Sequence, residues 1–243
     1  MAVVQAPPRP GRFASDLSPE RTPSNRVLTR LSESEQRRLL TGVTPLRLAP
    51  GTTMYDQGDI LRHAYFPLRG VISLLGMTPD GDSLQVAAVD STTFVGVPVV
   101  LEADRAPHLA VAHVACDVIR LDTATFRDAC RRDVQFHRAV LQCAHAQVIQ
   151  IGDAAVCHRF HTVLQRLSRT LLTFAAPLRD TTVPLTQEVL ASLLGADRSA
   201  ISRAAMQLHD SGATRQRHGA IQILSRGALR AHACDCGPAI DTH

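Results

Sequence analysis

The feature that most constrains this chain is a pair of amphipathic helices joined by a glycine turn, which spans residues 185–203 and reads LTQEVLASLLGADRSAISR. Thr186 is an N-cap candidate for the first helix, Gly195 offers a turn where a positive φ is cheap, and Asp197 can cap the second helix. Two helices crossed in this way form a helix-turn-helix, which presents the exposed side of its second helix to the major groove of DNA. The residues expected to read bases from that side are Arg198, Ser199, Ser202 and Arg203.

A helical hairpin inside an ordinary core is the alternative, because many proteins place glycine between two amphipathic helices. The residues that follow favour DNA binding instead. Two short alternating runs, residues 214–217 and 220–224, flank His218-Gly219 and predict a β-hairpin, or wing. Residues 186–231 contain six arginines against three acids, which suits a phosphate backbone. The residues expected to contact phosphates are Thr186, Gln187, Arg215, Arg217 and His218.

Length and composition allow one large or two ordinary domains and argue against a membrane or secreted protein. Hydrophobic residues make up 45% of the 243, and no apolar run is long enough to span a bilayer. The net charge of +4 permits nucleic-acid binding. Lysine is absent, which we attribute first to a bias in codon composition and only second to function. Residues 1–24 lack the apolar segment of a signal peptide, so we expect a disordered tail on a cytoplasmic protein.

The six cysteines are scattered, and no CxxC pair occurs, so a disulfide framework is not expected. Cys157, His158 and His161 lie close in sequence, as do Cys234 and Cys236, and a metal or redox site built from them is one interpretation. The ligand spacings of structural zinc sites are missing, however, and cysteine is a common small core residue. We therefore expect neither a metal site nor catalytic residues.

Residues 25–121 predict a helix followed by a β-rich region. The helix covers residues 25–40, with Ser32 and Glu35 as a capping box. Short strands separated by Gly-rich turns then indicate an antiparallel roll or barrel. The predicted strands are residues 45–48, 52–55, 64–67, 71–77, 83–89, 110–115 and 117–121.

A long helix is predicted over residues 122–158, with apolar positions that repeat at sevens. The repeat spans about three heptads, the minimum for a coiled-coil dimer, and a helix packed on its own barrel is the alternative. The predicted dimer seam consists of Val134, Leu141, Ala144, Val148 and Ile151. A further helix is predicted over residues 162–174.

This order of β-roll, long helix and winged helix resembles the cyclic-AMP receptor protein / fumarate-nitrate regulator (Crp/Fnr) family. The motifs of the roll include YDQGD at residues 55–59, AYFP at 64–67, GVIS at 70–73 and FVG at 94–96. The resemblance implies an α+β fold and a homodimer on a two-fold operator, with RNA polymerase as a further partner. It divides the chain into a roll (25–132), a dimerisation helix (133–160), a winged helix-turn-helix (161–233) and a tail (234–243).

The chain departs from the family's cyclic-nucleotide cassette, in which an acid follows a glycine and an Arg-Ser/Thr-Ala triplet lies downstream. Gly96 is followed by Val97, His108 stands in the triplet region, and Arg105 is out of register. A cyclic phosphate without an Arg and a ribose without an acceptor would both be under-satisfied. We therefore expect a degenerate cassette that cyclic AMP does not control. No cofactor is predicted, although His63, His108 and His113 leave a haem sensor open.

The recognition helix departs as well, because Ser199 stands where the family carries a Glu that accepts from cytosine. The leading hypothesis is a dimeric, sequence-specific DNA-binding regulator that is not an enzyme. The rivals are a small-molecule, haem or redox sensor whose roll ligand gates DNA binding, a scaffold without DNA binding, and a cupin-type barrel enzyme. The predicted strands at 71–77 and 83–89 carry no His, which disfavours cupin metal chemistry.

Overall fold

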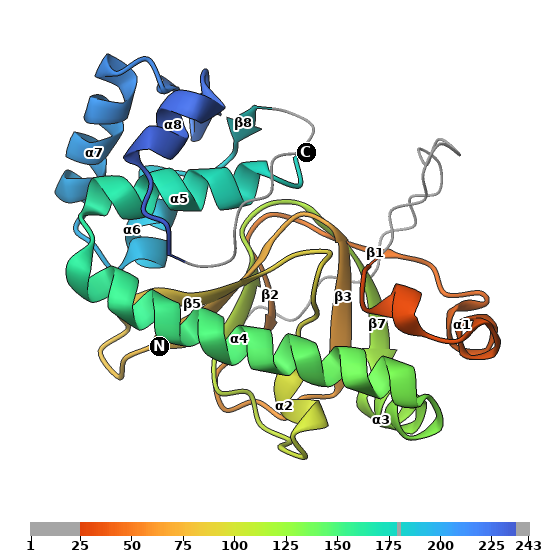
Figure 1. Cartoon of the computed structure of the whole chain (residues 1–243). Helices are drawn as coiled ribbons and strands as arrows, with labels where there is room; N and C mark the ends of the chain where they lie inside the picture. The colour runs from red at the N-terminus through yellow and green to blue at the C-terminus, as the bar shows by residue number, and fades with distance from the viewer. Residues whose placement is uncertain (1–24, 179–180, 237–243) are drawn as a thin grey trace.

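The structure is a computed structural model that describes residues 25–178 and 181–236. The predicted N-terminal tail (1–24) and most of the predicted C-terminal tail (234–243) lie outside these residues. Figure 1 shows a β-roll, a long helix that crosses it, and a second, largely helical unit at the far end of that helix. The α+β class predicted from the sequence is confirmed.

The roll consists of two antiparallel sheets. The first has the order β1-β7-β3 and the second the order β2-β6-β4-β5. The strand bounds are β1 Leu46–Leu48, β2 Thr52–Tyr55, β3 His63–Arg69, β4 Ile72–Met77, β5 Ser83–Val89, β6 Leu109–Ala112 and β7 Cys116–Asp122. All seven agree with the predicted strands to within a few residues, because the alternation within the strands and the turn residues beside most of them are local signals.

Short helices flank the roll: a 3-10 turn at Leu28–Arg30, α1 (Glu33–Leu40), α2 (Val97–Val100) and α3 (Thr123–Arg132). A cluster of four fully buried rings joins these helices to the strands. Phe66 of β3, Phe94, Phe126 of α3 and Phe136 contact one another with ring centroids 5.4–6.0 Å apart. Edge-to-face and stacked rings at such distances add to the stability that burial alone provides.

The long helical run is two helices, which corrects the sequence prediction of one. α3 ends at Asp133, and α4 (Val134–Phe160) begins there. The Asp133 carboxylate accepts hydrogen bonds from the amides of Gln135 and Phe136 at 3.0 Å and from the amide of Ser32 at 2.7 Å. The break is therefore an N-cap that also anchors the start of α1. The predicted capping box is absent, since the Ser32 side chain makes no cap hydrogen bond and Glu35 pairs with Arg38.

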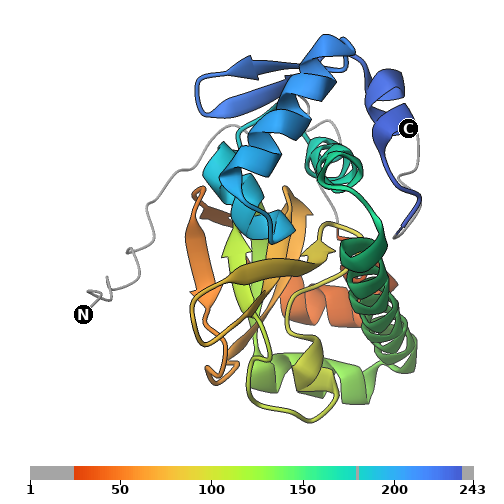
Figure 2. The same cartoon turned by 90° about the vertical axis from the view of Figure 1, so that its left-hand side faces the viewer.

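The second unit begins with α5 (Val163–Ala175), which Thr162 and Gln165 start with a capping box. The helices α6 (Gln187–Leu194) and α7 (Arg198–Asp210) form the helix-turn-helix. A three-stranded sheet of order β8-β10-β9 and the helix α8 (Arg226–His232) complete the unit. Its strands are β8 Thr182–Val183, β9 Thr214–Arg217 and β10 Ala220–Ile223. The wing predicted from residues 214–224 is thus present (Figure 2).

The two units touch where α6 meets β5. A Cβ at Gly195 would lie only 2.8 Å from the Cδ1 atom of Leu84, and the hydroxyls of Ser83 and Ser192 are in hydrogen-bonding contact. Ser83 also donates to the carbonyl of Ser192 at 3.3 Å. The turn of the helix-turn-helix therefore rests directly on a strand of the roll. Among the described residues, no helix is both long and apolar enough to cross a membrane.

Candidate functional site

The local sequence builds the helix-turn-helix as expected. The Thr186 hydroxyl accepts the amide of Val189 at 3.2 Å, which caps α6. Gly195 adopts φ +50, so the left-handed turn is made where it costs least. Asp197 occupies the N-cap position of α7, but its side chain makes no cap hydrogen bond. The apolar sides of the two helices are buried against each other and against α5, through Leu190, Leu193, Leu194, Ile201, Ala204, Ala205 and Leu208.

The opposite side of α7 faces outward (Figure 2). Arg198, Ser199 and Arg203 are exposed, and Ser202 is half-buried. The four predicted base-reading residues therefore lie on an accessible helix surface. Met206, one turn further along, is 59% exposed on the same helix, and sequence reasoning did not single it out. An exposed apolar side chain at that place can contact a thymine methyl group. Met206 could have been selected from the sequence, because it lies four residues after Ser202 and therefore on the same side of the helix.

Arg198 already has a partner in the free protein. Its Nη1 atom donates to Oε1 of Glu188 at 3.2 Å, and both side chains are largely exposed. An exposed ion pair of this kind contributes little to stability. The pair therefore holds the guanidinium near the start of the recognition helix and gives way cheaply to a stronger acceptor.

The wing carries a second set of exposed polar side chains. Arg215, Arg217 and His218 are all exposed, and Arg217 donates two hydrogen bonds to Oε1 of Gln222, at 3.2 and 3.1 Å. A hollow of about 260 Å³ lies between the recognition helix and the wing, lined by Gln187, Ser202, Ala205, Met206, His209, Arg215 and Gln216. Two of the predicted phosphate contacts, Gln187 and Arg215, thus line the same hollow as the predicted base-reading residue Ser202, whereas the Thr186 hydroxyl is already used as a helix cap.

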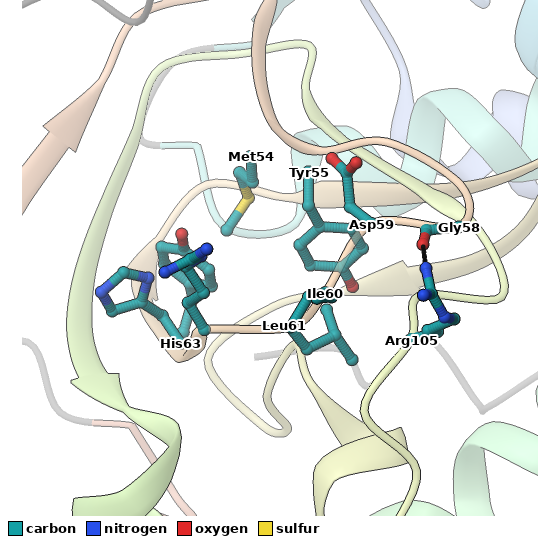
Figure 3. A pocket seen from close by; sticks show the side chains of 10 residues that line it. Met54, Tyr55, Gly58, Asp59, Ile60, Leu61, His63 and Arg105 are labelled. Carbon is teal, nitrogen blue, oxygen red and sulfur yellow. Dashed lines mark hydrogen bonds between the residues drawn. The ribbon is translucent and has the colours of Figure 1, made fainter.

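A pocket of about 480 Å³ opens on the roll, as Figure 3 shows. It is lined by Met54, Tyr55, Gly58, Asp59, Ile60, Leu61, Arg62, His63, Tyr65 and Arg105. Arg105 donates through Nη1 to the carbonyl of Gly58 at 2.9 Å. Burial raises the pKa of the Tyr55 phenol and lowers the pKa of His63. Within the described residues, the pocket is therefore lined by two exposed guanidiniums, those of Arg62 and Arg105, and by one carboxylate, that of Asp59.

The remaining cassette residues do not form a polar site. Gly96, with φ +117, precedes α2, and a Cβ there would lie 3.3 Å from Cα of Ala64. Val97, which follows it, is 6% exposed and packs into the roll. His108 is half-buried, and burial lowers its pKa. The buried Nε2 of His113 has no hydrogen-bond partner among the described residues.

The long helix α4 has two apolar sides. Phe136, Val140 and Ala144 are buried against the roll. The outward side exposes Val134, Leu141, Val148, Ile149, Val156 and Phe160. Ala144, predicted in the dimer seam, therefore lies on the side that faces its own roll, and Ile151 is half-buried. The outward stripe continues to Val156 and Phe160, two positions that the heptad pattern did not select.

Four of the scattered metal-ligand candidates converge. Cys157, His161, Cys234 and Cys236 place one ligand atom each within 4.8 Å of one another. His158 is not among them, because its ring contacts Arg166 instead. Burial and the positive charges of Arg166 and Arg169 lower the pKa of His158 to about 4, so its ring is neutral.

Two family models match the chain. The model described as a cyclic nucleotide-binding domain matches residues 45–133, and the Crp-like helix-turn-helix domain matches residues 165–232. No curated protein matches.

Solved structures share the fold across most of the chain. FixK2 of Bradyrhizobium japonicum superposes with a TM-score of 0.67 at 18% identity, over 80% of this chain and 99% of that one. A CRP-family transcriptional regulator of Thermus thermophilus gives 0.66 at 20% identity, over 79% and 98%. CLP of Xanthomonas campestris, described as a c-di-GMP responsive global regulator, gives 0.63 at 18%, over 80% and 100%.

The matched ranges cover the roll and the winged helix, and the solved structures cover about four fifths of the chain. The resemblance seen in the sequence motifs is therefore confirmed by an independent comparison of each domain. The chain belongs to the Crp/Fnr family of transcriptional regulators and carries a DNA-binding helix-turn-helix domain.

Proposed function

We propose that this regulator binds a two-fold DNA site as a homodimer, in the cytoplasm, and acts there on RNA polymerase. The observation that carries the proposal is the exposed side of α7, where Arg198, Ser199, Ser202 and Arg203 lie together on an amphipathic helix. Arginine at this place can bind guanine through two hydrogen bonds, and the wing arginines can bind the flanking phosphates. The Ser199 hydroxyl can both donate and accept hydrogen bonds, whereas a Glu carboxylate only accepts, so we expect looser base preference beside the Arg198 contact.

The outward stripe of α4 supports the dimer. Val148 is 64% exposed and Phe160 is 72% exposed in the single chain. Apolar residues on one side of a helix this long favour a two-fold partner that covers them. Two copies of α7 related by such an axis would reach half-sites about 34–36 Å apart.

We do not expect cyclic AMP to be the effector of this protein. Val97 is buried where the family's cassette has an acid, and Arg105 is bonded to a carbonyl of its own chain. The pocket of about 480 Å³ supports a different small molecule as an input.

Selection of bound DNA from a random pool, with the full-length protein, tests DNA recognition. The expected result is a two-fold sequence with half-sites about one helical turn apart. The same selection with small molecules from a cell extract tests for an effector. If an effector controls DNA binding, the specific sequence is enriched only when these molecules are present. Recovery of unenriched DNA under both conditions would contradict the proposal.

Analytical sedimentation tests the dimer. Val148→Glu places a charge in the outward stripe and should give monomers that no longer bind a two-fold site tightly. Val148→Leu is the matched control, because it changes the same exposed side chain without placing a charge in the outward stripe. A wild-type protein that sediments as a monomer at micromolar concentration would refute the model.

A further inference from the structure

We propose that Cys157, His161, Cys234 and Cys236 form a binding site for one Zn²⁺ ion, which clamps the C-terminal segment to the end of the long helix. The four ligand atoms come from two places that are far apart in sequence. Cys157 lies in the last turn of α4, and His161 is the residue that ends it. Cys234 and Cys236 follow α8, whose C-terminal segment descends to the end of α4 in Figures 1 and 2.

The distances fit tetrahedral zinc. Cys157 Sγ lies 3.4 Å from Cys234 Sγ, and Cys236 Sγ lies 3.4 Å from His161 Nδ1. All four atoms lie within 4.8 Å of one another. Zinc–sulfur bonds of about 2.3 Å in a tetrahedron put two sulfurs about 3.8 Å apart, so small side-chain movements would complete the site. Three thiolates and one imidazole are a ligand set typical of structural zinc sites.

The surrounding charge fits the complex. Three thiolates, one neutral imidazole and one Zn²⁺ ion carry a net charge of −1, and binding releases the three thiol protons. Two arginines interact electrostatically with the cluster: Arg166 with Cys157 and Cys234, and Arg169 with Cys157 and Cys236. Arg169 also donates to the carbonyl of Cys236 at 3.1 Å, which holds the C-terminal segment in place.

Arg166 provides an independent reason to place negative charge here. It is only 8% exposed, and within the described residues no carboxylate pairs with it. Its buried Nε has no hydrogen-bond partner there either, although one Nη donates to the carbonyl of Leu194 at 2.8 Å. A buried guanidinium without a counter-charge is costly. An anionic zinc–thiolate complex beside it would supply that charge.

The site would fix the joint between the two units. His161 and Thr162 are the residues between α4 and α5, and His161 is also a ligand. A metal held by the joint and by the segment after α8 ties the first and last helices of the DNA-binding unit to the long helix. We infer that zinc holds this unit in one orientation on α4, independently of any ligand in the roll.

Metal analysis of the full-length protein tests the site. Reduced, metal-stripped protein is titrated with Zn²⁺ alone, and with Co²⁺ as a spectroscopic probe. We expect one metal per chain, the absorption bands of tetrahedral cobalt–thiolate coordination, and a rise in Tm with Zn²⁺. Cys236→Ser, a change at a half-buried position, should weaken Zn²⁺ binding by more than about 100-fold, since loss of a mere outer-shell partner costs 10–100-fold. His161→Gln should weaken Zn²⁺ binding as well, and it should change the absorption bands of bound Co²⁺ because the imidazole ligand is lost.

Cys143→Ser is the matched control, because Cys143 is a half-buried thiol outside the cluster, and it should bind Zn²⁺ as the wild type does. Circular dichroism of the metal-free variants checks that they fold. The proposal is overturned if fully reduced wild-type protein binds no Zn²⁺, or if Cys236→Ser binds it as tightly as Cys143→Ser. The proposal is also overturned if Cys157 and Cys234 form a disulfide in the purified protein and the protein still binds no Zn²⁺ after this disulfide is reduced.

Discussion

Replacement of Arg198 by alanine should weaken binding to the selected operator by about 1–2 kcal/mol, or about 5–30-fold. A bidentate arginine–guanine contact provides about 1–3 kcal/mol of discrimination. In the free protein, however, Arg198 pairs with Glu188 at 3.2 Å, and an exposed pair of this kind contributes about 0.2–1 kcal/mol. The wild type must break that pair to contact a base, so the net loss in the variant falls in the lower part of the range.

The same pair gives the prediction a second, opposite arm. Glu188→Gln removes the competing acceptor and one negative charge near the phosphates, so it should tighten binding by about 1.5–5-fold. The control for Arg198→Ala is Arg37→Ala. Like Arg198→Ala, it removes one positive charge and one exposed ion pair, here with Glu33, but it does so on α1, beside the roll.

Fluorescence anisotropy with the selected operator, and with single-base variants of it, measures the wild type and the three variants at one salt concentration. Arg198→Ala should also lose preference at one base pair in each half-site. If Arg198→Ala bound as tightly as Arg37→Ala, or if Glu188→Gln bound more weakly than the wild type, the recognition-helix assignment would be refuted.

Three further predictions concern the wing, the roll and the helix junction. Arg217→Ala should weaken binding to all sequences alike and lower the salt dependence measured by anisotropy, whereas a sequence-dependent loss would place the wing in a groove. Calorimetric titration with cyclic AMP or cyclic GMP should give no saturable heat, and micromolar affinity for either would contradict the interpretation of Val97 and Arg105. Hydrogen bonds from the amides of Phe136, Ser32 and Gln135 hold the pKa of Asp133 below its ordinary value. Its stabilisation is therefore present at neutral pH and lost as pH falls through that lowered pKa. Urea unfolding should show a steeper loss of stability below about pH 4 for the wild type than for Asp133→Asn, and equal slopes would count against the cap.

The strands and the helix-turn-helix were predictable because their signals are local. β2 and β5 occupy the predicted residues, 52–55 and 83–89, since alternation and flanking turn residues suffice to define a short strand. The cap of α6 and the turn at Gly195 follow from residue types at fixed positions. The break at Asp133 was missed because apolar spacing runs across it, and because part of its cause is a hydrogen bond to Ser32, 101 residues away.

Two parts of the candidate sites depend on tertiary packing and were beyond the sequence pattern. A seven-residue repeat cannot tell which side of α4 its own roll covers, so Ala144 was assigned to the seam although it is 5% exposed in the single chain. The cysteine cluster joins Cys157 to Cys234, which are 77 residues apart. No local spacing rule detects ligands that meet only after the DNA-binding unit has folded back onto the helix.

The turn at Gly195 limits how far this protein can be rebuilt from exchangeable parts. Its backbone conformation, φ +50, is one that an L side chain adopts at a cost, and a Cβ there would lie 2.8 Å from Leu84 of the other domain. A winged helix grafted from a relative with a larger residue at this turn would carry that backbone cost and would displace the Cδ1 methyl of Leu84, the end of a flexible side chain. Chimeric regulators that keep this roll are therefore expected to fit best with a donor whose turn is also glycine, since a larger residue requires both a strained φ and a displaced Leu84 side chain.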